Sequence, residues 1–306
     1  MSEAAARRPL PSRIMGNPWL LLTFSSLVWG GNVVAARCAV GEISPMVLVG
    51  LRWIVVSAIV AVMMRGRLMA TLRSLQPHWA YLLPMGVLGF TISNAMLYEG
   101  ARFTSGVNVA IIQGVLPVLV LAGARIVYGV RAGFVRWIGV AITMAGIVLI
   151  ATEGEPQRIL DLQINKGDAF AFLGAAIYAA FTLALRKKPP MSAMAFFMGV
   201  ALAALVSSMP AMLVEAWLGG AVWPGFQGLM VLLYVAIFTS IIGQICWIRA
   251  VEMLGPGRAG VFQNLVPVFG AILSVAVLRE AFHWHHAASL GLVLTGLFIS
   301  ELGRRN

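Results

Sequence analysis

Charged residues are scarce in this chain. Only 11% of its 306 residues are Asp, Glu, Lys or Arg, whereas 60% are hydrophobic and the mean hydropathy is +0.90. A soluble domain of this size would lack the surface charge that keeps a protein in solution. The composition therefore excludes an ordinary soluble globular protein.

Cysteines, histidines and the common phosphate-binding and metal-binding motifs are also scarce or absent in the sequence. The two cysteines, Cys38 and Cys246, lie far apart in or beside apolar runs, so we expect small hydrophobic side chains and no disulfide. The chain has no Gly-Lys-Ser/Thr phosphate loop and no His-Glu-x-x-His motif. Three of its four histidines, at 283, 285 and 286, fall in a predicted turn, where an interfacial loop is favoured over a metal site. We predict no metal, no cofactor and no enzymatic activity.

Long apolar runs are what the chain has in abundance. Each is about 20 residues long, enough to cross ~30 Å of hydrocarbon as a helix. The pattern predicts an all-α polytopic membrane protein with ten spans, at 18–38, 45–64, 79–98, 107–128, 135–151, 169–185, 191–213, 226–247, 260–278 and 287–302.

The net charge of +11 does not indicate a nucleic-acid partner, because the basic residues occur one to three at a time between apolar runs. Most of the 22 Lys and Arg residues fall in segments that share one side of the membrane with both ends of the chain. The positive-inside rule predicts that both termini are cytoplasmic. The first run lacks a small-residue cleavage site, so we expect a membrane span there and not a signal peptide.

One stretch of the chain occurs twice. Asn94–Pro117 overlies Gln244–Pro267 when the numbering is shifted by 150, which places Gln113 on Gln263. The repeat predicts a duplication, with five spans at 18–151, a periplasmic linker at 152–168 and five spans at 169–302. Because five is odd, the second half enters the membrane upside down. Such inverted repeats are typical of secondary transporters with a substrate site near the midplane.

Amides recur at equivalent places inside these spans. Asn94 and Gln113 are predicted near one side of the membrane, and Gln244, Gln263 and Asn264 near the other. Unpaired polar groups cost several kcal/mol in hydrocarbon. These amides are therefore predicted either to line the two ends of one translocation cavity or to join helices through backbone carbonyls.

Pro117 and Pro267 are predicted inside helices, where each removes a backbone hydrogen bond about one turn from a Gln. The kink is predicted to be either a hinge for alternating access or a fixed feature of packing.

Aromatic residues form a third group. Trp29 and Tyr178 correspond at a shift of 149 and are predicted to stack on a substrate or to pack, and Asn32 shares the face of Trp29. Tyr98 could extend the layer of Asn94, although an interfacial aromatic is favoured.

Arg52 is the most unusual residue, because it lies within a span that has no acid. An intramembrane Arg indicates function by default. It is predicted to bind a substrate carboxylate, to extend to the membrane surface, or to pair with Glu99 or Glu280.

These residues together resemble one family. Trp29–Asn32 (WGGN), Pro45, Arg52, the two Gln-x-x-x-Pro motifs, Leu278–Glu280 (LRE), Gly291 and Gly296 occur in the order and spacing of the EamA family of the drug/metabolite transporter superfamily. The resemblance covers nearly the whole chain as two EamA-like repeats. It implies a ten-helix transporter of the bacterial inner membrane, most often an exporter of amino acids or related metabolites. The first repeat departs from the pattern, since it has no acid where the second has LRE.

The sequence thus predicts a secondary transporter that exports small metabolites, above all amino acids with aromatic or other apolar side chains. The alternatives are efflux of drugs or cations, transport of a nucleoside or vitamin, and a receptor or assembly subunit that moves no solute. The expected partners are the solute and the lipid bilayer, and the protein is expected to be a monomer or homodimer.

Overall fold

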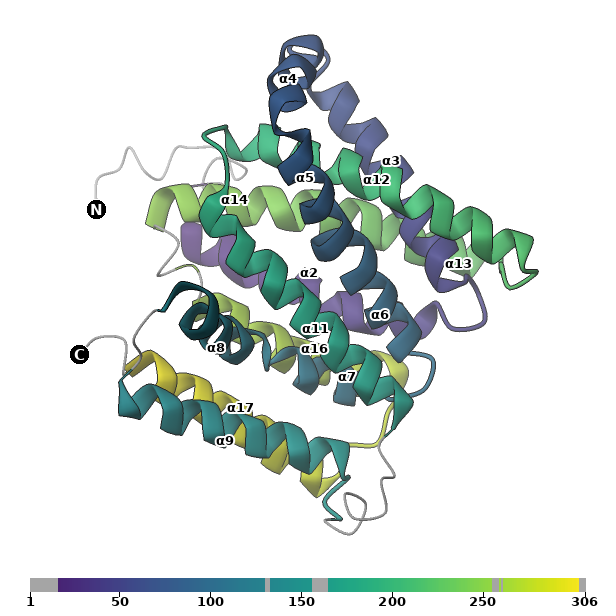
Figure 1. Ribbon diagram of the computed structural model, residues 1–306. Coiled ribbons are helices and arrows are strands. Elements are labelled where there is room, and N and C mark those ends of the chain that lie inside the picture. Colours follow the sequence, from purple (N-terminus) through teal and green to yellow (C-terminus); the bar gives the residue numbers. More distant parts are fainter. Residues whose placement is uncertain (1–15, 130–132, 156–164, 255–258, 260, 303–306) are drawn as a thin grey trace, which may run out of the picture.

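The chain is built from helices. The computed structural model describes residues 16–129, 133–155, 165–254, 259 and 261–302, and in this part all regular secondary structure is helical (Figure 1). The first half contains α2 (Pro18–Cys38), α3 (Pro45–Met63), α4 (Leu68–Leu75), η2 (Gln76–His78), α5 (Trp79–Gly86), η3 (Val87–Ile92), α6 (Ser93–Gly100), α7 (Gly106–Gln113), α8 (Leu116–Tyr128) and α9 (Phe134–Ala151). The second half contains α11 (Lys166–Ala184), η4 (Leu185–Lys187), α12 (Ala193–Trp217), α13 (Phe226–Leu233), η5 (Tyr234–Ile242), α14 (Gly243–Leu254), η6 (Val261–Asn264), α16 (Leu265–Leu278) and α17 (Trp284–Leu302).

In the described part of the chain, each of the ten predicted spans overlaps a helix or a run of consecutive helices. In the described part, eight helical runs are long and apolar enough to cross a membrane, and the run Phe262–Leu278 is apolar but shorter. The tenth predicted span corresponds to α17, which is 19 residues long but includes His285, His286 and Glu301. The structure therefore supports a multi-span helical architecture, while the count of ten crossings stays a prediction.

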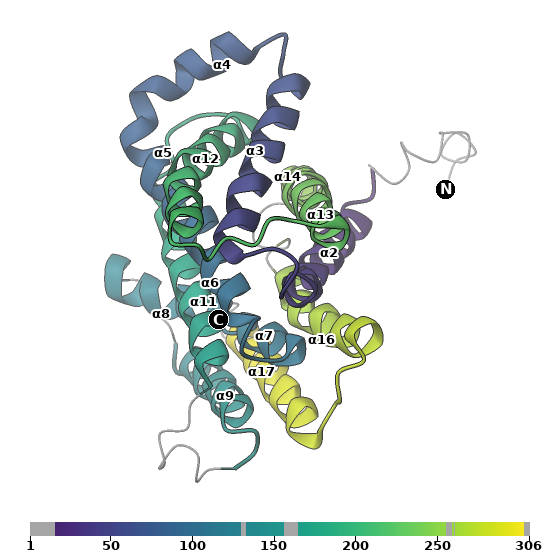
Figure 2. The same ribbon diagram turned by 90° about the vertical axis from the view of Figure 1, so that its right-hand side faces the viewer.

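The long helices run between two ends of one bundle. The start of α2 and the end of α17 lie at one end, on the left of Figure 1, which we call the Pro18 end. The opposite end, called the Ser44 end, holds the turn between α2 and α3. Figure 2 views the bundle from the Ser44 end: α3 and α12 lie together on one side, α9 and α17 on the opposite side, and α2, α7, α11 and α16 lie between them.

Helix starts are set by short polar side chains. The Asn17 side chain accepts hydrogen bonds from the backbone N–H groups of Trp19 and Leu20, and Ser105, Asn165 and Ser192 cap α7, α11 and α12 in the same way. These caps satisfy amide groups that a helix leaves without internal partners.

Glycines allow α9 and α17 to pack closely and antiparallel. Gly139 lies against Gly296, and seven residues further along α9, Gly146 lies against Ser289. A shift of 150 turns the first contact into the second. A similar exchange occurs between other helices at shifts of 149 and 150, since Ser25 contacts Gly243 just as Gly174 contacts Ser93.

Two helical runs contain a wider, π-helical segment. In the first half η3 follows α5, and in the second half η5 follows α13. A shift of 150 moves η3 (87–92) to 237–242, within η5. Such segments disturb the regular backbone hydrogen bonding and occur often at functional sites.

Pro117 and Pro267 do not lie in helix interiors, contrary to the prediction from the sequence. Helix α7 ends at Gln113, Gly114 and Val115 form a turn, and Pro117 is the second residue of α8. Pro267 is likewise the third residue of α16, directly after η6. The prediction was wrong because a proline is accommodated in the first turn of a helix, where its missing N–H needs no partner.

The predicted linker 152–168 is shorter than expected. Residues 156–164 lie outside the described residues, and Asn165 caps α11, which begins at Lys166. Asp168 is therefore in the first turn of α11 and only 4% exposed. It accepts a hydrogen bond of 2.6 Å from the Thr104 hydroxyl, which joins the two halves at the Ser44 end.

Glutamates also join the halves at this end. Glu280 accepts hydrogen bonds from the backbone N–H groups of Gly106 and Val107 at the start of α7, at 2.8 and 3.0 Å, and lies 3.5 Å from Arg37. Glu215 accepts from the Ser44 hydroxyl and from the Val47 N–H at the start of α3. Carboxylates stabilise helix N-termini through these charge-assisted bonds.

The seam between α9 and α17 provides a test of packing. A Cβ atom at Gly296 would lie 2.5 Å from the Gly139 carbonyl oxygen and 2.6 Å from the Thr143 nitrogen, both of them backbone atoms. We expect Gly296→Ala to destabilise the protein by about 1–3 kcal/mol, measured as a lower Tm in detergent. The matched control is Gly291→Ala in the same helix, where a Cβ meets nothing within 4 Å. An equal Tm for the two variants would contradict close packing of this seam.

Candidate functional site

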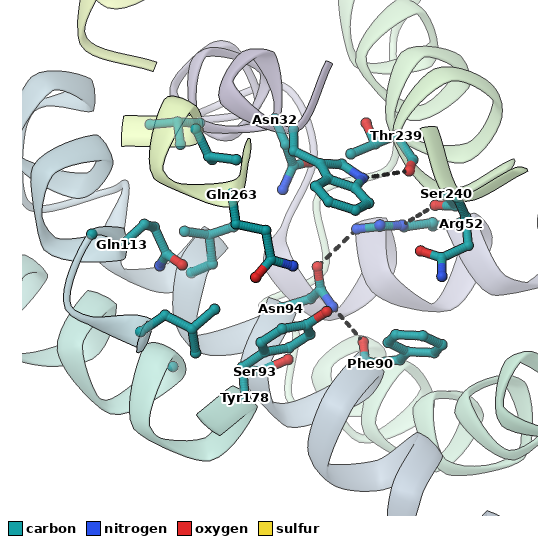
Figure 3. Close-up of a pocket in the computed structure, with 18 of the residues that line it drawn as sticks. Asn32, Arg52, Phe90, Ser93, Asn94, Gln113, Tyr178, Thr239, Ser240 and Gln263 are labelled. Carbon is teal, nitrogen blue, oxygen red and sulfur yellow. Dashed lines mark hydrogen bonds between the residues drawn. The ribbon is translucent and has the colours of Figure 1, made fainter. Parts of the chain in front are cut away.

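A central cavity of about 180 Å³ lies between the two halves (Figure 3). One water needs roughly 10–15 Å³, so the cavity has room for a solute on the order of ten heavy atoms. Its polar lining consists of Trp29, Asn32, Arg52, Ser93, Asn94, Gln113, Tyr178, Thr239, Ser240, Gln244, Gln263 and Asn264. Its remaining lining residues are Val33, Trp53, Phe90, Leu97, Gly114, Leu116, Pro117, Gly174, Phe197 and Val266. Helices α9 and α17 contribute no described residue to this wall.

The lining shows where the cavity extends. Towards the Pro18 end it reaches Phe197, one turn into α12, and Gln263 in η6. Towards the Ser44 end it stops at Asn32, Arg52 and Leu97. The polar contacts of Asp168, Glu215 and Glu280 lie beyond this limit.

Arg52 is the single charged residue in the described lining. Its side chain is 6% exposed. Nε donates to the Ser240 hydroxyl at 2.7 Å, and Nη1 donates to Asn94 Oδ1 at 2.8 Å and to the Tyr98 hydroxyl at 2.7 Å. The guanidinium also lies 5.2 Å from the centre of the Trp53 ring. Arg52 therefore neither extends to the surface nor pairs with the glutamates that the sequence offered: Glu99 pairs with Arg102, and Glu280 with Arg37.

The π-helical segments offer backbone carbonyls to the same region. The Phe90 carbonyl accepts from Asn94 Nδ2 at 2.8 Å and from Trp53 Nε1 at 3.2 Å. In η5 the Thr239 carbonyl accepts from Trp29 Nε1 at 3.1 Å. Asn94 thus uses both ends of its amide, and it connects η3 to Arg52 (Figure 3).

Four other amides of the lining make no such bonds. The side chains of Gln113, Gln244, Gln263 and Asn264 form no hydrogen bond with the described part of the chain, and all four are partly exposed. The sequence left open whether these amides join helices or face a cavity. In the structure they face the cavity, where each can donate to and accept from a solute.

The structure brings all but two of the sequence-predicted site residues to this cavity wall. Pro267 is buried nearby in α16 without lining the cavity. Tyr98, for which an interfacial position was favoured, is 2% exposed in the protein core. That expectation was wrong because position near a helix end does not reveal what packs around it: here the Tyr98 hydroxyl receives a bond from Arg52 and donates one to Asn32 at 3.2 Å.

Sequence reasoning missed most of the aromatic lining. Trp53, Phe90 and Phe197 lie on the cavity wall but look like ordinary apolar residues of their spans. Thr239 and Ser240 could have been found, because they are adjacent polar residues within an apolar run.

The histidine turn lies away from the cavity. His283 donates its backbone N–H to His286 Nδ1 at 2.9 Å, at the start of α17. In the described part of the chain, no group of three or more His, Cys, Asp or Glu side chains is arranged to hold a metal ion.

Comparisons with known proteins agree with this architecture. The model of the EamA-like transporter family matches the chain twice, over residues 17–152 and 165–302. A solved crystal structure that is 18% identical covers 94% of this chain and 97% of its own, with a TM-score of 0.61, and so shares the fold.

Curated relatives are similar over most of their length. YyaM, an uncharacterized transporter of Bacillus subtilis, is 27% identical, covering 85% of this chain and 86% of the relative. YedA, an uncharacterized inner membrane transporter of Escherichia coli strain K12, is 24% identical, covering 91% and 88%. An uncharacterized transporter of Archaeoglobus fulgidus is 24% identical, covering 92% and 97%.

Two equivalent amides are expected to differ in their effect on stability. Asn94→Ala removes bonds to Arg52 and to the Phe90 carbonyl, and should lower the free energy of unfolding by about 1–3 kcal/mol. Gln244→Ala, the repeat-related control, removes no bond of the described structure and should change it by less than about 1 kcal/mol. Thermal unfolding in detergent measures both. A larger loss in Gln244→Ala than in Asn94→Ala would contradict the assignment of these amides.

Proposed function

The chain belongs to the EamA-like transporter family, and on that premise we propose that it is a secondary transporter that carries a small metabolite through the central cavity by alternating access. The proposal rests above all on four cavity amides that form no hydrogen bond with the described part of the chain, Gln113, Gln244, Gln263 and Asn264. Polar groups left unpaired at membrane depth are tolerated where they line a watery or solute-filled cavity.

We further propose that ten helices form two inverted repeats of five. The exchange of the contacts Gly139–Gly296 and Gly146–Ser289 under a shift of 150 supports this arrangement, as does the position of a π-helical segment in each half. Inverted repeats allow two similar conformations that open to opposite sides of the membrane.

The broken helices fit the same mechanism. The chain leaves α7 at Gln113 and enters α8 through a turn, and at the equivalent place η6 passes into α16 after Asn264. In secondary transporters, discontinuous helices commonly present side chains and backbone groups to the substrate at the midplane.

For the orientation, we propose that the Pro18 end, with both termini, is cytoplasmic. The basic residues Arg65, Arg67, Arg73, Arg186, Lys187 and Lys188 lie in turns and short helices at this end, in accordance with the positive-inside rule. In a bacterial inner membrane the Ser44 end would then face the periplasm.

For the substrate, we propose an amino acid with an apolar side chain, moved outwards. The rings of Trp29, Trp53, Phe90, Tyr178 and Phe197 line the cavity beside the amides and Arg52. Such a wall suits a molecule with an apolar part and both donor and acceptor groups.

Transport from proteoliposomes tests the proposal. Vesicles holding wild-type protein are loaded singly with labelled phenylalanine, leucine, a nucleoside or an organic cation, and efflux is followed with and without a pH gradient. We expect efflux of an amino acid, and a reduction of about tenfold or more in Gln113→Ala and Gln263→Ala, since losing one solute hydrogen bond of about 1.4 kcal/mol corresponds to tenfold.

The control is Gln227→Ala, which removes an exposed amide of α13 outside the cavity and should leave efflux unchanged. Efflux of only the nucleoside or the cation would overturn the amino-acid substrate and keep the transporter. No efflux of any solute, from protein with a normal Tm, would overturn the transport function.

A further inference from the structure

Arg52 has N–H donors and a positive charge that could bind an anion. Its three acceptors, Ser240, Asn94 and Tyr98, are all neutral, and no described carboxylate lies within ion-pair distance of it. Nη2 makes no hydrogen bond to the described part of the chain. The guanidinium therefore presents free N–H donors and an uncompensated positive charge.

No other charged residue of the described cavity wall offsets the positive charge of Arg52. The described lining contains no Asp, Glu, Lys or second Arg, so its formal charge is the single positive unit of Arg52. A buried charge without a partner is expensive in a membrane interior. A bound anion would relieve this cost, and a guanidinium binds carboxylates and phosphates through two parallel hydrogen bonds.

Tyr98 separates the cavity from a second pocket. This pocket measures about 100 Å³, lies at the Ser44 end, and is lined by Tyr98 together with Gly41, Ser44 and Val222. The Tyr98 hydroxyl accepts from Arg52 and donates to Asn32, and both of these residues line the central cavity. The three side chains thus form a hydrogen-bonded barrier between the two spaces.

In the sequence, Arg52 and Tyr98 have no polar equivalents in the second half. A shift of 148 to 150 takes Arg52 to the stretch Val200–Leu202 of α12, which is wholly apolar. The same shift of 150 takes Tyr98 to Ile248. We call the hydrogen-bonded group of Arg52, Tyr98 and Asn32 the latch. All three of its residues belong to the first half, although the helical scaffold around them is duplicated.

We propose that Arg52 binds the anionic group of the transported solute, a carboxylate or phosphate, and that this contact draws the guanidinium away from Tyr98 and opens the cavity towards the Ser44 end. Two parallel hydrogen bonds need a second donor besides Nη2, so the solute competes with the Tyr98 hydroxyl for Nη1, and binding and opening are linked. The inference rests on the proposed transport function, and it names the substrate class as solutes with an anionic group.

Ligand binding to the purified full-length protein tests whether Arg52 binds an anionic group. The probes are L-phenylalanine, phenyl phosphate, succinate, and phenylalaninamide, which replaces the carboxylate of phenylalanine with a neutral amide. We expect at least one anionic probe to raise the Tm of wild type while phenylalaninamide does not. Arg52→Gln should weaken that binding by about tenfold or more, and Arg52→Lys by less, because the charge remains without the planar fork.

The probes also identify the anionic group. A higher Tm with phenyl phosphate alone indicates a phosphate ester, whereas a higher Tm with phenylalanine or succinate indicates a carboxylate. No stabilisation by any anionic probe, or equal stabilisation of Arg52→Gln, overturns the anion site. If wild type and Arg52→Gln export the same solute equally well from proteoliposomes, the inference fails while the proposed function stands.

Thiol labelling tests the latch without knowledge of the solute. A reporter cysteine replaces Val33, which lines the central cavity and is 2% exposed, in protein carrying Cys38→Ser and Cys246→Ser. A membrane-impermeant thiol reagent is applied from the side of the Ser44 end. We expect Tyr98→Phe to raise the labelling rate severalfold, because the ring remains but its hydrogen bonds to Arg52 and Asn32 are lost.

Tyr81→Phe is the matched control, since its hydroxyl donates to the Ala184 carbonyl at 2.8 Å, away from the barrier. It should leave the labelling rate unchanged. Equal rates in Tyr98→Phe and Tyr81→Phe would overturn the latch. Each variant loses a single hydroxyl, and a Tm measurement of each variant checks that the protein is folded.

Discussion

Hydrocarbon offers no hydrogen-bond partner, so every polar group within the bundle must find one inside the protein or in a cavity. This constraint shapes the places where the helices are irregular. In η3 the Phe90 carbonyl accepts from Asn94 and Trp53, and in η5 the Thr239 carbonyl accepts from Trp29. Where the chain turns between α7 and α8, it does so beside the cavity. The irregular backbone and the polar cavity are therefore two aspects of one arrangement.

The duplication governs the scaffold more than the chemistry. Glycine contacts, π-helical segments and the Gln-x-x-x-Pro stretches recur in both halves. Arg52, Tyr98 and Asn32, in contrast, form a hydrogen-bonded cluster within the first half, and the second-half residues equivalent to Arg52 and Tyr98 are apolar. A transporter needs two related conformations, which symmetry supplies, but it also needs a difference between its two sides. The unmatched cluster is where the structure offers such a difference.

Much of the helical architecture could be predicted from the sequence, because apolar runs near 20 residues leave few other structures for a chain in a membrane. The same reasoning placed most of the candidate residues on what proved to be one wall, since polar residues within such runs need a common cavity or a partner. This reasoning failed for residues whose position depends on which other helices pack around them. Tyr98 was assigned to the membrane–water interface because it lies near the end of a predicted span. Pro117 and Pro267 were assigned to helix interiors because each lies within a long apolar run.

The amino-acid sequence by itself determined the helical membrane architecture, the duplication, and the unusual presence of Arg52, because hydropathy, repeats and a lone charge are visible along one dimension. Only the tertiary structure decided what each polar group contacts. Asn94 and Gln244 are equivalent in the sequence, yet Asn94 is held between Arg52 and Phe90, while Gln244 faces the cavity without a hydrogen-bond partner among the described residues. Hydrogen bonds depend on distances of about 3 Å between residues far apart in the chain, and those distances exist only once the helices have packed.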